Sequence, residues 1–195
     1  MSQKFSLYGD LKVWENIRLF GGIYGLSKRQ LSQKTDELLD ILGLEKERNT
    51  LVDSLPLGWK QKLSFSVAII HEPKIVFLDE PTGGVDPVTR RQFWELIYEA
   101  AARGITIFVT THYMDEAVQA DRVVVMDDGV IRLDGAPRAV FAHVDELKAL
   151  GLDVPQATEL ADRLGFTEHA VLNTAECVDV LISNLEEQKL GCTDL

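Results

Sequence analysis

The amino-acid sequence predicts an α/β fold in which helices pack on a small parallel sheet. Two short apolar runs, Ile75–Leu78 and Ile105–Thr110, are typical of strands that are buried in a sheet. The residues between them have the apolar spacing of a helix. Because a strand, a helix and a strand in this order form parallel strands with a right-handed crossover, we expect both runs in one sheet.

Helices are predicted before the first strand. Apolar residues recur at helical spacing from Trp14 to Tyr24 and again from Leu31 to Leu42. Ser27 and Gln30 fit a capping box at the start of the second of these segments. Lys60–His71 has the pattern of a third helix.

The crossover helix has clear predicted ends. Asp86 followed by Pro87 is a good helix start, and Gly104 is placed to stop the helix. Beyond the second strand we expect a short helix and then a hairpin turning at Asp128-Gly129. The expected segments after Thr110 are Met114–Gln119, the hairpin strands Val123–Met126 and Val130–Leu133, and helices near Val144–Leu150, Pro155–Leu164 and Ala175–Leu185.

Composition limits the class of protein. The 195 residues carry a formal net charge of −11, whereas binding to phosphate backbones depends largely on Lys and Arg, so no nucleic-acid partner is expected. No apolar run approaches the roughly 20 residues that cross a bilayer. The segment Met1–Lys4 has no secretory pattern, which favours a cytoplasmic location. Cys177 and Cys192 lack metal-ligand spacing and are expected to be reduced and structural.

Charge also suggests a domain boundary. From His143 to Leu195 the chain has eleven Asp or Glu against three Lys or Arg. We therefore expect one domain over residues 1–136, with a mainly helical part (1–72) and a sheet part (73–136). Residues 137–195 are expected to form an acidic helical extension.

Two carboxylates follow the first predicted strand. Asp79 and Glu80 come where that strand reaches the carboxyl edge of its sheet, the usual ligand crevice of α/β proteins. Hydrolysis of a nucleoside triphosphate needs an oxygen ligand for Mg²⁺ and a base that orients water. In this interpretation Asp79 binds the metal and Glu80 orients the water. The alternative is a solvated or helix-capping acid pair.

The wider pattern resembles that of ABC transporter ATPases. Leu78-Asp79-Glu80-Pro81-Thr82 is similar to their Walker B segment, and it is followed at the right distance by Asp86-Pro87 and Thr111-His112. The resemblance implies part of a P-loop NTPase fold that uses ATP and Mg²⁺. It makes Gly84, Val85 and Asp86 the D-loop, which crosses to a partner subunit. It also makes His112 the switch histidine that reaches the terminal phosphate, in the same crevice as Glu80.

Two further segments are interpreted through the same resemblance. Gln3 matches the glutamine of the Q-loop, which senses the metal and contacts the membrane partner. The segment Leu55-Pro56-Leu57-Gly58-Trp59 occupies the place of the signature Leu-Ser-Gly-Gly-Gln, whose helix start and serine hold ATP on the opposite subunit. Only Leu55 and Gly58 match, and Pro56 has no hydroxyl. Both a divergent working signature, similar to that of drug-efflux-type ABC-2 ATPases, and a decayed one stay open.

The phosphate-gripping loop is missing from the pattern. No stretch fits Gly-x-x-x-x-Gly-Lys-Ser/Thr, so the resemblance implies that this loop lies upstream of Gln3. We therefore expect a sheet with an exposed edge and part of its core uncovered, and marginal stability for the chain alone.

The last part of the chain resembles a different group of ABC ATPases. Val140-Phe141, Leu147–Gln156 and Thr158–Leu164 are similar to the C-terminal extension of energy-coupling-factor importers, which take up vitamins or metal ions such as cobalt. A composite gene, an assembly artefact and an intermediate subfamily all stay open. The apolar faces here either pair two ATPase subunits, as the resemblance implies, or close a small helical core.

The leading hypothesis is a motor subunit that hydrolyses ATP to power an ABC transporter at the inner face of the membrane. Its partners would be a transmembrane permease and a second ATPase subunit, identical or different. The first alternative is a non-catalytic half-domain that complements a partner ATPase. The second is an energy-coupling-factor importer rather than an exporter. A soluble ABC ATPase of translation or DNA repair is disfavoured by the acidic balance and the tail.

Overall fold

The computed structural model describes residues 7–166 and 170–190. Its contacts separate two compact units, Met1–Thr110 and Thr111–Leu195. The domain bounds expected from charge, 1–136 and 137–195, remain predictions. Within the described residues, no helix is long and apolar enough to cross a membrane.

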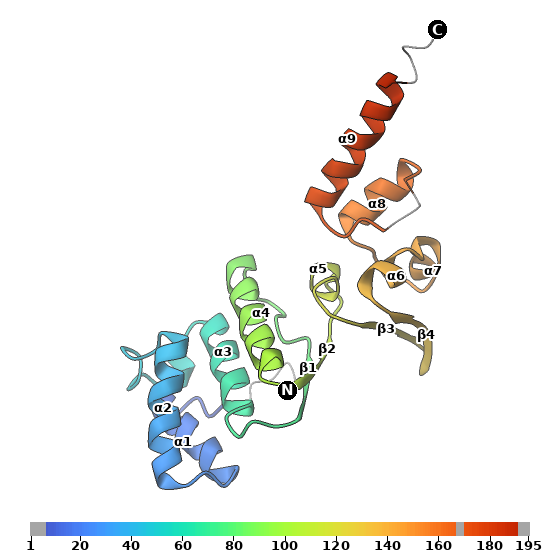
Figure 1. Cartoon of the computed structure of the whole chain (residues 1–195). Coiled ribbons are helices and arrows are strands. Elements are labelled where there is room, and N and C mark those ends of the chain that lie inside the picture. Colours follow the sequence, from blue (N-terminus) through green and yellow to red (C-terminus); the bar gives the residue numbers. More distant parts are fainter. Residues whose placement is uncertain (1–6, 167–169, 191–195) are drawn as a thin grey trace. The chain divides into compact units, whose positions relative to one another are not determined.

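The first unit begins with helices that share a core. Their bounds are α1 Val13–Ile23, α2 Lys28–Leu42, the short 3₁₀ helix η1 Val52–Ser54, and α3 Leu57–Ala68. Ser27 and Gln30 form the predicted capping box at the start of α2. Val13, Ile17, Leu39 and Leu63 are buried where α1, α2 and α3 meet (Figure 1).

The third helix differs from its prediction. It starts at Leu57 rather than Lys60 and ends at Ala68 rather than His71. Pro56 is its N-cap residue and has no side chain that can cap the helix. The backbone of Pro56 is still extended, with a φ of −55° and a ψ of 150°, so the helix begins at the next residue, which the apolar spacing alone does not reveal.

The sheet of the first unit consists of two parallel strands. These are β1 Ile75–Asp79 and β2 Thr106–Thr110, joined through α4 Pro87–Ala102, and Ile75 pairs with Thr106. The predicted parallel pair is therefore confirmed. Asp86 caps α4, and the helix ends two residues before Gly104, which has a φ of +89°.

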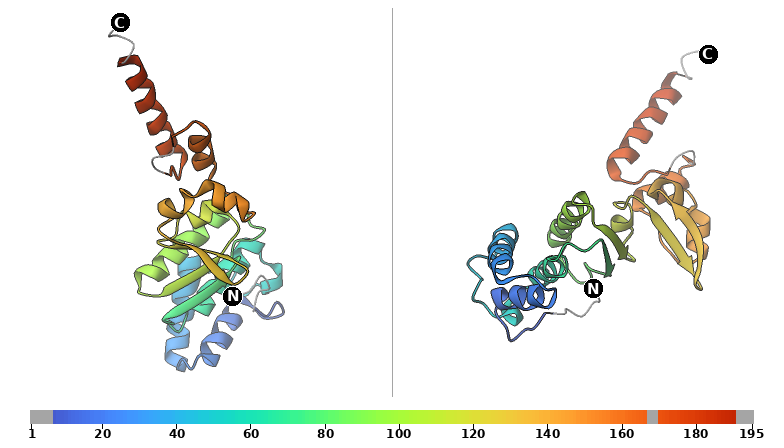
Figure 2. Two further views of the ribbon diagram at one scale, coloured as in Figure 1. Left: turned by 90° about the vertical axis from the view of Figure 1, so that its right-hand side faces the viewer. Right: turned by 60° about the horizontal axis from the view of Figure 1, so that its bottom comes forward.

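The expectation of buried strands is confirmed for one face of the sheet and wrong for the other. The side chains of Val76 and Leu78 are buried against α3 and α4, whereas Ile75, Phe77 and Phe108 are more than half exposed. Within the described residues of the first unit, α3 and α4 lie on one face of the sheet and leave the other open (Figure 2). Phe77 and Phe108 stack on the open face with ring centroids 5.0 Å apart. The expected exposure of part of the sheet core is thereby confirmed.

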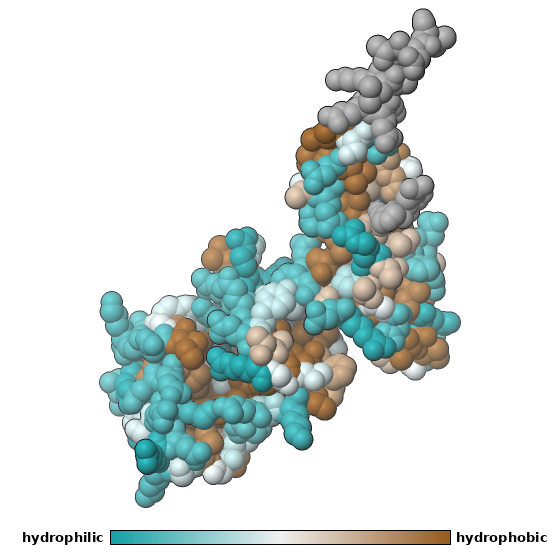
Figure 3. All heavy atoms as spheres, viewed as in Figure 1, coloured by the Kyte–Doolittle hydropathy of each residue, from teal (hydrophilic) through white to brown (hydrophobic). Residues whose placement is uncertain are grey.

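The second unit combines a hairpin with short helices. Its elements are α5 Met114–Ala117, β3 Val123–Asp127, β4 Val130–Gly135, α6 Pro137–Phe141, α7 Val144–Ala149, α8 Gln156–Arg163 and α9 Thr174–Leu190. The hairpin turns at Asp128 and Gly129, both with positive φ, as predicted. The prediction missed α6, although Pro137 at its first position is a typical helix start. Part of the apolar surface of this unit comes from exposed side chains of the hairpin, among them Met126 and Ile131 (Figure 3).

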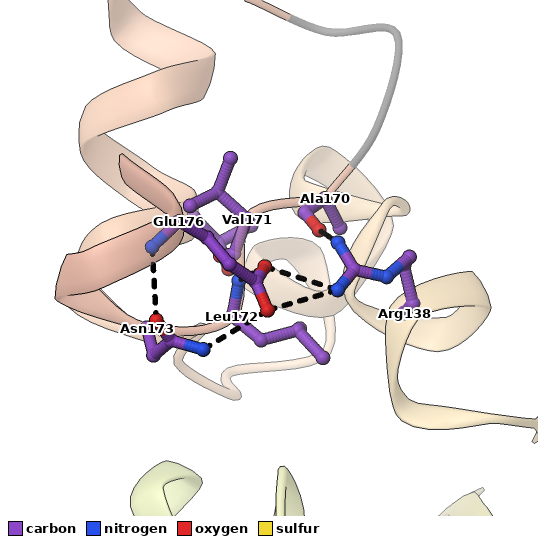
Figure 4. Close-up of polar contacts among 7 residues, drawn as sticks. Arg138, Ala170, Val171, Leu172, Asn173 and Glu176 are labelled. Carbon is purple, nitrogen blue, oxygen red and sulfur yellow. Dashed lines mark hydrogen bonds and ion pairs between the residues drawn. The ribbon is translucent and has the colours of Figure 1, made fainter. Parts of the chain in front are cut away.

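A polar cluster fastens α9 to α6 (Figure 4). Arg138 donates to the Ala170 carbonyl at 2.6 Å and to both carboxylate oxygens of Glu176 at 3.0 Å. Glu176 also accepts from the Leu172 amide, and this bond, helped by Arg138, holds the pKa of Glu176 below its usual range. Cys177, one residue further on, is buried and free. Cys192 lies outside the described residues.

Candidate functional site

The two predicted site carboxylates lie at the carboxyl end of β1, beside the last residue of β2. Asp79 pairs in register with Thr110. The Thr110 hydroxyl donates to Asp79 Oδ1 at 2.7 Å, and the Glu80 amide donates to the Thr110 carbonyl at 3.0 Å. Asp79 is exposed and Glu80 half-buried. The edge of the sheet thus presents both acids to solvent in a fixed arrangement.

Glu80 adopts an unusual backbone conformation. Its φ is +43°, in the left-handed region that residues other than Gly, Asn and Asp rarely adopt. Two contacts hold this conformation, because the Glu80 amide bonds to Thr110 and the Glu80 carbonyl accepts from the Gly83 amide at 3.1 Å. Backbone strain of this kind gathers at functional sites, where it aims a side chain.

The oxygen atoms at this edge fit a role in holding Mg²⁺. The Asp79 carboxylate and the Thr110 hydroxyl are the hard oxygen donors that Mg²⁺ takes, and Mg²⁺ commonly completes its shell with water and phosphate oxygens. Among the described residues there is no cluster of three or more His, Cys, Asp or Glu that could hold a metal. Water and phosphate oxygens would supply further ligands for a metal here.

The predicted D-loop forms a tight turn that leads into α4. Gly84 has a φ of +76°, a conformation that glycine adopts without strain, and Val85 is buried. Asp86 accepts from the Val88 and Thr89 amides at 3.0 Å and from the Thr89 hydroxyl at 2.6 Å. The Thr89 hydroxyl and amide hold the pKa of the Asp86 carboxyl below its usual range. Asp86 is therefore the negative cap of α4 in this structure.

The signature segment is divided between the core and the surface. Leu55 is buried and Trp59 packs on the core of the helical part, whereas Pro56 and Leu57 are exposed at the start of α3. Gly58 faces the Thr89 side chain so closely that a Cβ there would overlap it. The helix start that the signature requires is present, without a side-chain cap.

The signature helix contacts the D-loop directly. Gln61, one turn into α3, donates from Nε2 to the Gly83 carbonyl at 3.3 Å. The ideal Cβ position of Gly84 lies 3.7 Å from Leu57 Cδ2. Lys62, whose pKa is lowered by partial burial against the opposing pull of Glu95 and Asp86, donates to Gln92 on α4 at 2.9 Å. Two of the predicted motifs therefore form one packed element.

His112 lies in the second unit, in a loop with its own internal bonds. The neighbouring Thr111 hydroxyl donates to buried Glu116 at 2.7 Å and accepts from the Tyr113 amide at 3.0 Å. The imidazole is exposed and lies 4.2 Å from the Tyr113 ring, centroid to centroid. Its convergence with Asp79 and Glu80 stays a prediction. Gln3, the other predicted metal-sensing residue, lies outside the described residues.

Sequence reasoning missed three residues that build this region. Thr110 fixes both site acids, Gln61 contacts the D-loop, and Thr89 completes the Asp86 cap. Thr110 ends a predicted strand next to the first one in the sheet, and this position could have identified it. Nothing in the local pattern singles out Gln61 or Thr89.

Comparison with known proteins places these motifs in a family. Residues 1–83 match the ABC transporter family. The probable multidrug ABC transporter ATP-binding protein YbhF of Escherichia coli is 46% identical over 149 residues, which is 76% of this chain and 25% of that protein. The energy-coupling factor transporter ATP-binding protein EcfA1 of Clostridium perfringens is 40% identical over 141 residues, 72% of this chain and 50% of that protein.

A solved structure agrees with these relatives. CbiO1 from Clostridium perfringens, described as part of the ABC transporter complex CbiONQ, superposes with a TM-score of 0.63 at 27% identity, covering 75% of this chain and 59% of that one. This match confirms the expected P-loop NTPase fold class. The chain spans a quarter to a half of the length of the curated relatives described above. On its motifs, its fold and these matches, the chain belongs to the ABC transporter ATP-binding family.

Proposed function

We propose that this chain forms part of the ATP-hydrolysing motor subunit of an ABC transporter and powers transmembrane transport. The observation that carries the proposal is the arrangement of Asp79, Glu80 and Thr110 at the carboxyl edge of β1 and β2. In the proposed reaction Glu80 orients the attacking water, and His112 contacts the terminal phosphate. Asp79 and Gln3 would bind Mg²⁺, and Thr110 would hold the Asp79 carboxylate in place. The bound Mg²⁺ would neutralise charge on the phosphates.

The proposed partners follow from the family. The start of α3, from Leu55 to Trp59, would meet ATP bound by a second ATPase subunit, and the D-loop from Gly84 to Asp86 would cross to the same subunit. The Leu57 and Gly58 amides lie in the first turn of α3, where the helix dipole favours an anion, so contact with phosphate would rest on the backbone. A permease would place the assembly peripherally on the inner face of the membrane.

The proposal is tested by hydrolysis assays. We expect this chain alone to release no measurable phosphate from ATP, because its sequence contains no Gly-x-x-x-x-Gly-Lys-Ser/Thr loop. Fusion behind the N-terminal half of the ATPase domain of the Escherichia coli relative should give Mg²⁺-dependent turnover. Glu80→Gln in that fusion should lower turnover at least a hundredfold, whereas Glu45→Gln, at an exposed position on the helical part, should leave it unchanged.

Two outcomes of these assays would count against the proposal. Turnover by the fusion that survives Glu80→Gln would remove Glu80 from the reaction. Turnover by this chain alone that Glu80→Gln abolishes would overturn the expected inactivity. The direction of transport follows from the permease that co-purifies with the subunit, because the relatives include both a multidrug protein and energy-coupling-factor proteins.

A second candidate function is a non-catalytic half-domain that lends its signature segment and D-loop to a partner ATPase. The lack of a Gly-x-x-x-x-Gly-Lys-Ser/Thr stretch in the sequence favours it, and the packing of the two motifs within the first unit is compatible with it. In this case the chain would stimulate a partner that binds ATP, and Glu80→Gln would leave the stimulation intact.

A further inference from the structure

We propose that Gln61 is a positioning residue that locks the Gly83–Gly84 peptide and makes the D-loop move with the signature helix. The functional consequence rests on the proposed function above, but the lock itself is a property of the first unit. Gln61 lies on α3 and is 5% exposed, and its Nε2 donates across to the Gly83 carbonyl, 22 residues later in the chain.

The bond acts on a peptide that would otherwise turn easily. Two consecutive glycines have few steric barriers, so the plane of the Gly83–Gly84 peptide can rotate between orientations. In a trans peptide the carbonyl oxygen and the next N–H point in opposite directions. By holding the Gly83 carbonyl toward α3, Gln61 therefore turns the Gly84 N–H away from α3. The positive φ of Gly84 belongs to this one orientation.

Gln61 destabilises the core, which indicates that its role is not to fill space there. Its Oε1 is buried and has no hydrogen-bond partner among the residues that the structure describes. A buried acceptor without a partner destabilises the folded state, and an apolar side chain of similar length would avoid that loss. The unpaired Oε1 of Gln61 lowers the stability of the core, whereas its Nε2 forms one hydrogen bond to the D-loop. This exchange is expected of a residue whose role is to fix another segment.

The contacts around Gln61 add further links between α3, the D-loop and α4. Leu57 approaches Gly84, and Gly58 packs on Thr89, which in turn bonds to Asp86. The first turns of α3 and α4 and the loop before α4 are thus joined at three points. A ligand that moves the start of α3 would move the D-loop as well, and Gln61 supplies a direct hydrogen bond from α3 to that loop.

Hydrogen exchange of the 195-residue chain tests the lock without any ATPase assay. Gln61→Met has nearly the same length but cannot donate. We expect the Gly83, Gly84 and Val85 amides to exchange roughly three- to tenfold faster in this variant, the loss that one hydrogen bond produces. Global stability in urea should stay equal or rise, because the orphan oxygen is gone. The matched control is Gln33→Met, which removes an exposed bond to Glu37 on α2 and should not alter D-loop exchange.

Three results would overturn the lock. The first is unchanged amide exchange in the D-loop of Gln61→Met. The second is an equal rise in exchange, in the same variant, at core amides of α4 such as Phe93. The third is native-like protection of the D-loop in Gln61→Leu, which also lacks a donor. In the hydrolysing fusion, Gln61→Met should lower kcat more than it raises KM for ATP. If the D-loop exchanges faster but kcat is unchanged, Gln61 does fix the D-loop, and only the claim that this affects hydrolysis fails.

Discussion

Gly58 offers a sharp test of how the signature segment packs. A Cβ at this position would overlap the Thr89 side chain, mainly its Cγ2 methyl. Thr89 cannot easily turn away, because β-branched side chains are stiff and its hydroxyl is bonded to Asp86 at 2.6 Å. Overpacking of this kind costs about 1–3 kcal/mol. Replacing a helical glycine by alanine stabilises the helix by at most about 1 kcal/mol, and by less in a first turn.

We therefore expect Gly58→Ala to lower the free energy of unfolding by about 1–2 kcal/mol. In a chain of this size that loss lowers Tm by roughly 2–8 °C. Thr89→Ser removes the methyl group but keeps the hydroxyl for Asp86, so Gly58→Ala should cost little when Thr89→Ser is present. Urea unfolding of the four proteins in this double-mutant cycle should give a coupling of about 1–2 kcal/mol.

Thr89→Val is the matched control for this cycle. It keeps the methyl group and loses the hydroxyl, so it should not relieve Gly58→Ala. Equal rescue by Thr89→Val and Thr89→Ser would show that the clash with Cγ2 is not the cause of the destabilisation. A neutral or stabilising Gly58→Ala would refute the packing of α3 on α4 described above.

Three further outcomes are expected. Arg138→Ala should lower Tm by about 2–4 °C, the shift that about 1 kcal/mol gives in a chain of this size, and calorimetry would measure it. Because the pKa of Glu176 is depressed in the folded state, its contribution is present above its ordinary pKa of 4.5 and is lost as pH falls through the lower folded value. The Tm difference between the native chain and Glu176→Gln should therefore shrink below pH 4.5, and a constant difference would contradict this account. Phe77→Ser, at a side chain that is 66% exposed, should reduce binding of a hydrophobic dye and self-association. It should lower Tm only slightly, through loss of the stack on Phe108, whereas a large fall in Tm would mean that Phe77 is part of the core.

Much of this protein is determined by local sequence. The capping box of Ser27, the Asp86-Pro87 helix start and the Asp128-Gly129 turn were predictable because each depends on residues within a few positions of one another. The acid pair Asp79 and Glu80 was predictable as a site for a related reason, since the end of a parallel strand is a defined place in an α/β fold.

Other features were decided only by the tertiary structure. Apolar runs predicted strands but not that α3 and α4 would cover the same face of the sheet and leave Phe77 exposed. The partners Thr110 for Asp79 and Gln61 for Gly83 lie more than 20 residues away along the chain. Contacts of this kind depend on strand register and on how the helices dock. Both are set by packing between distant segments, so the pattern within a single segment does not determine them.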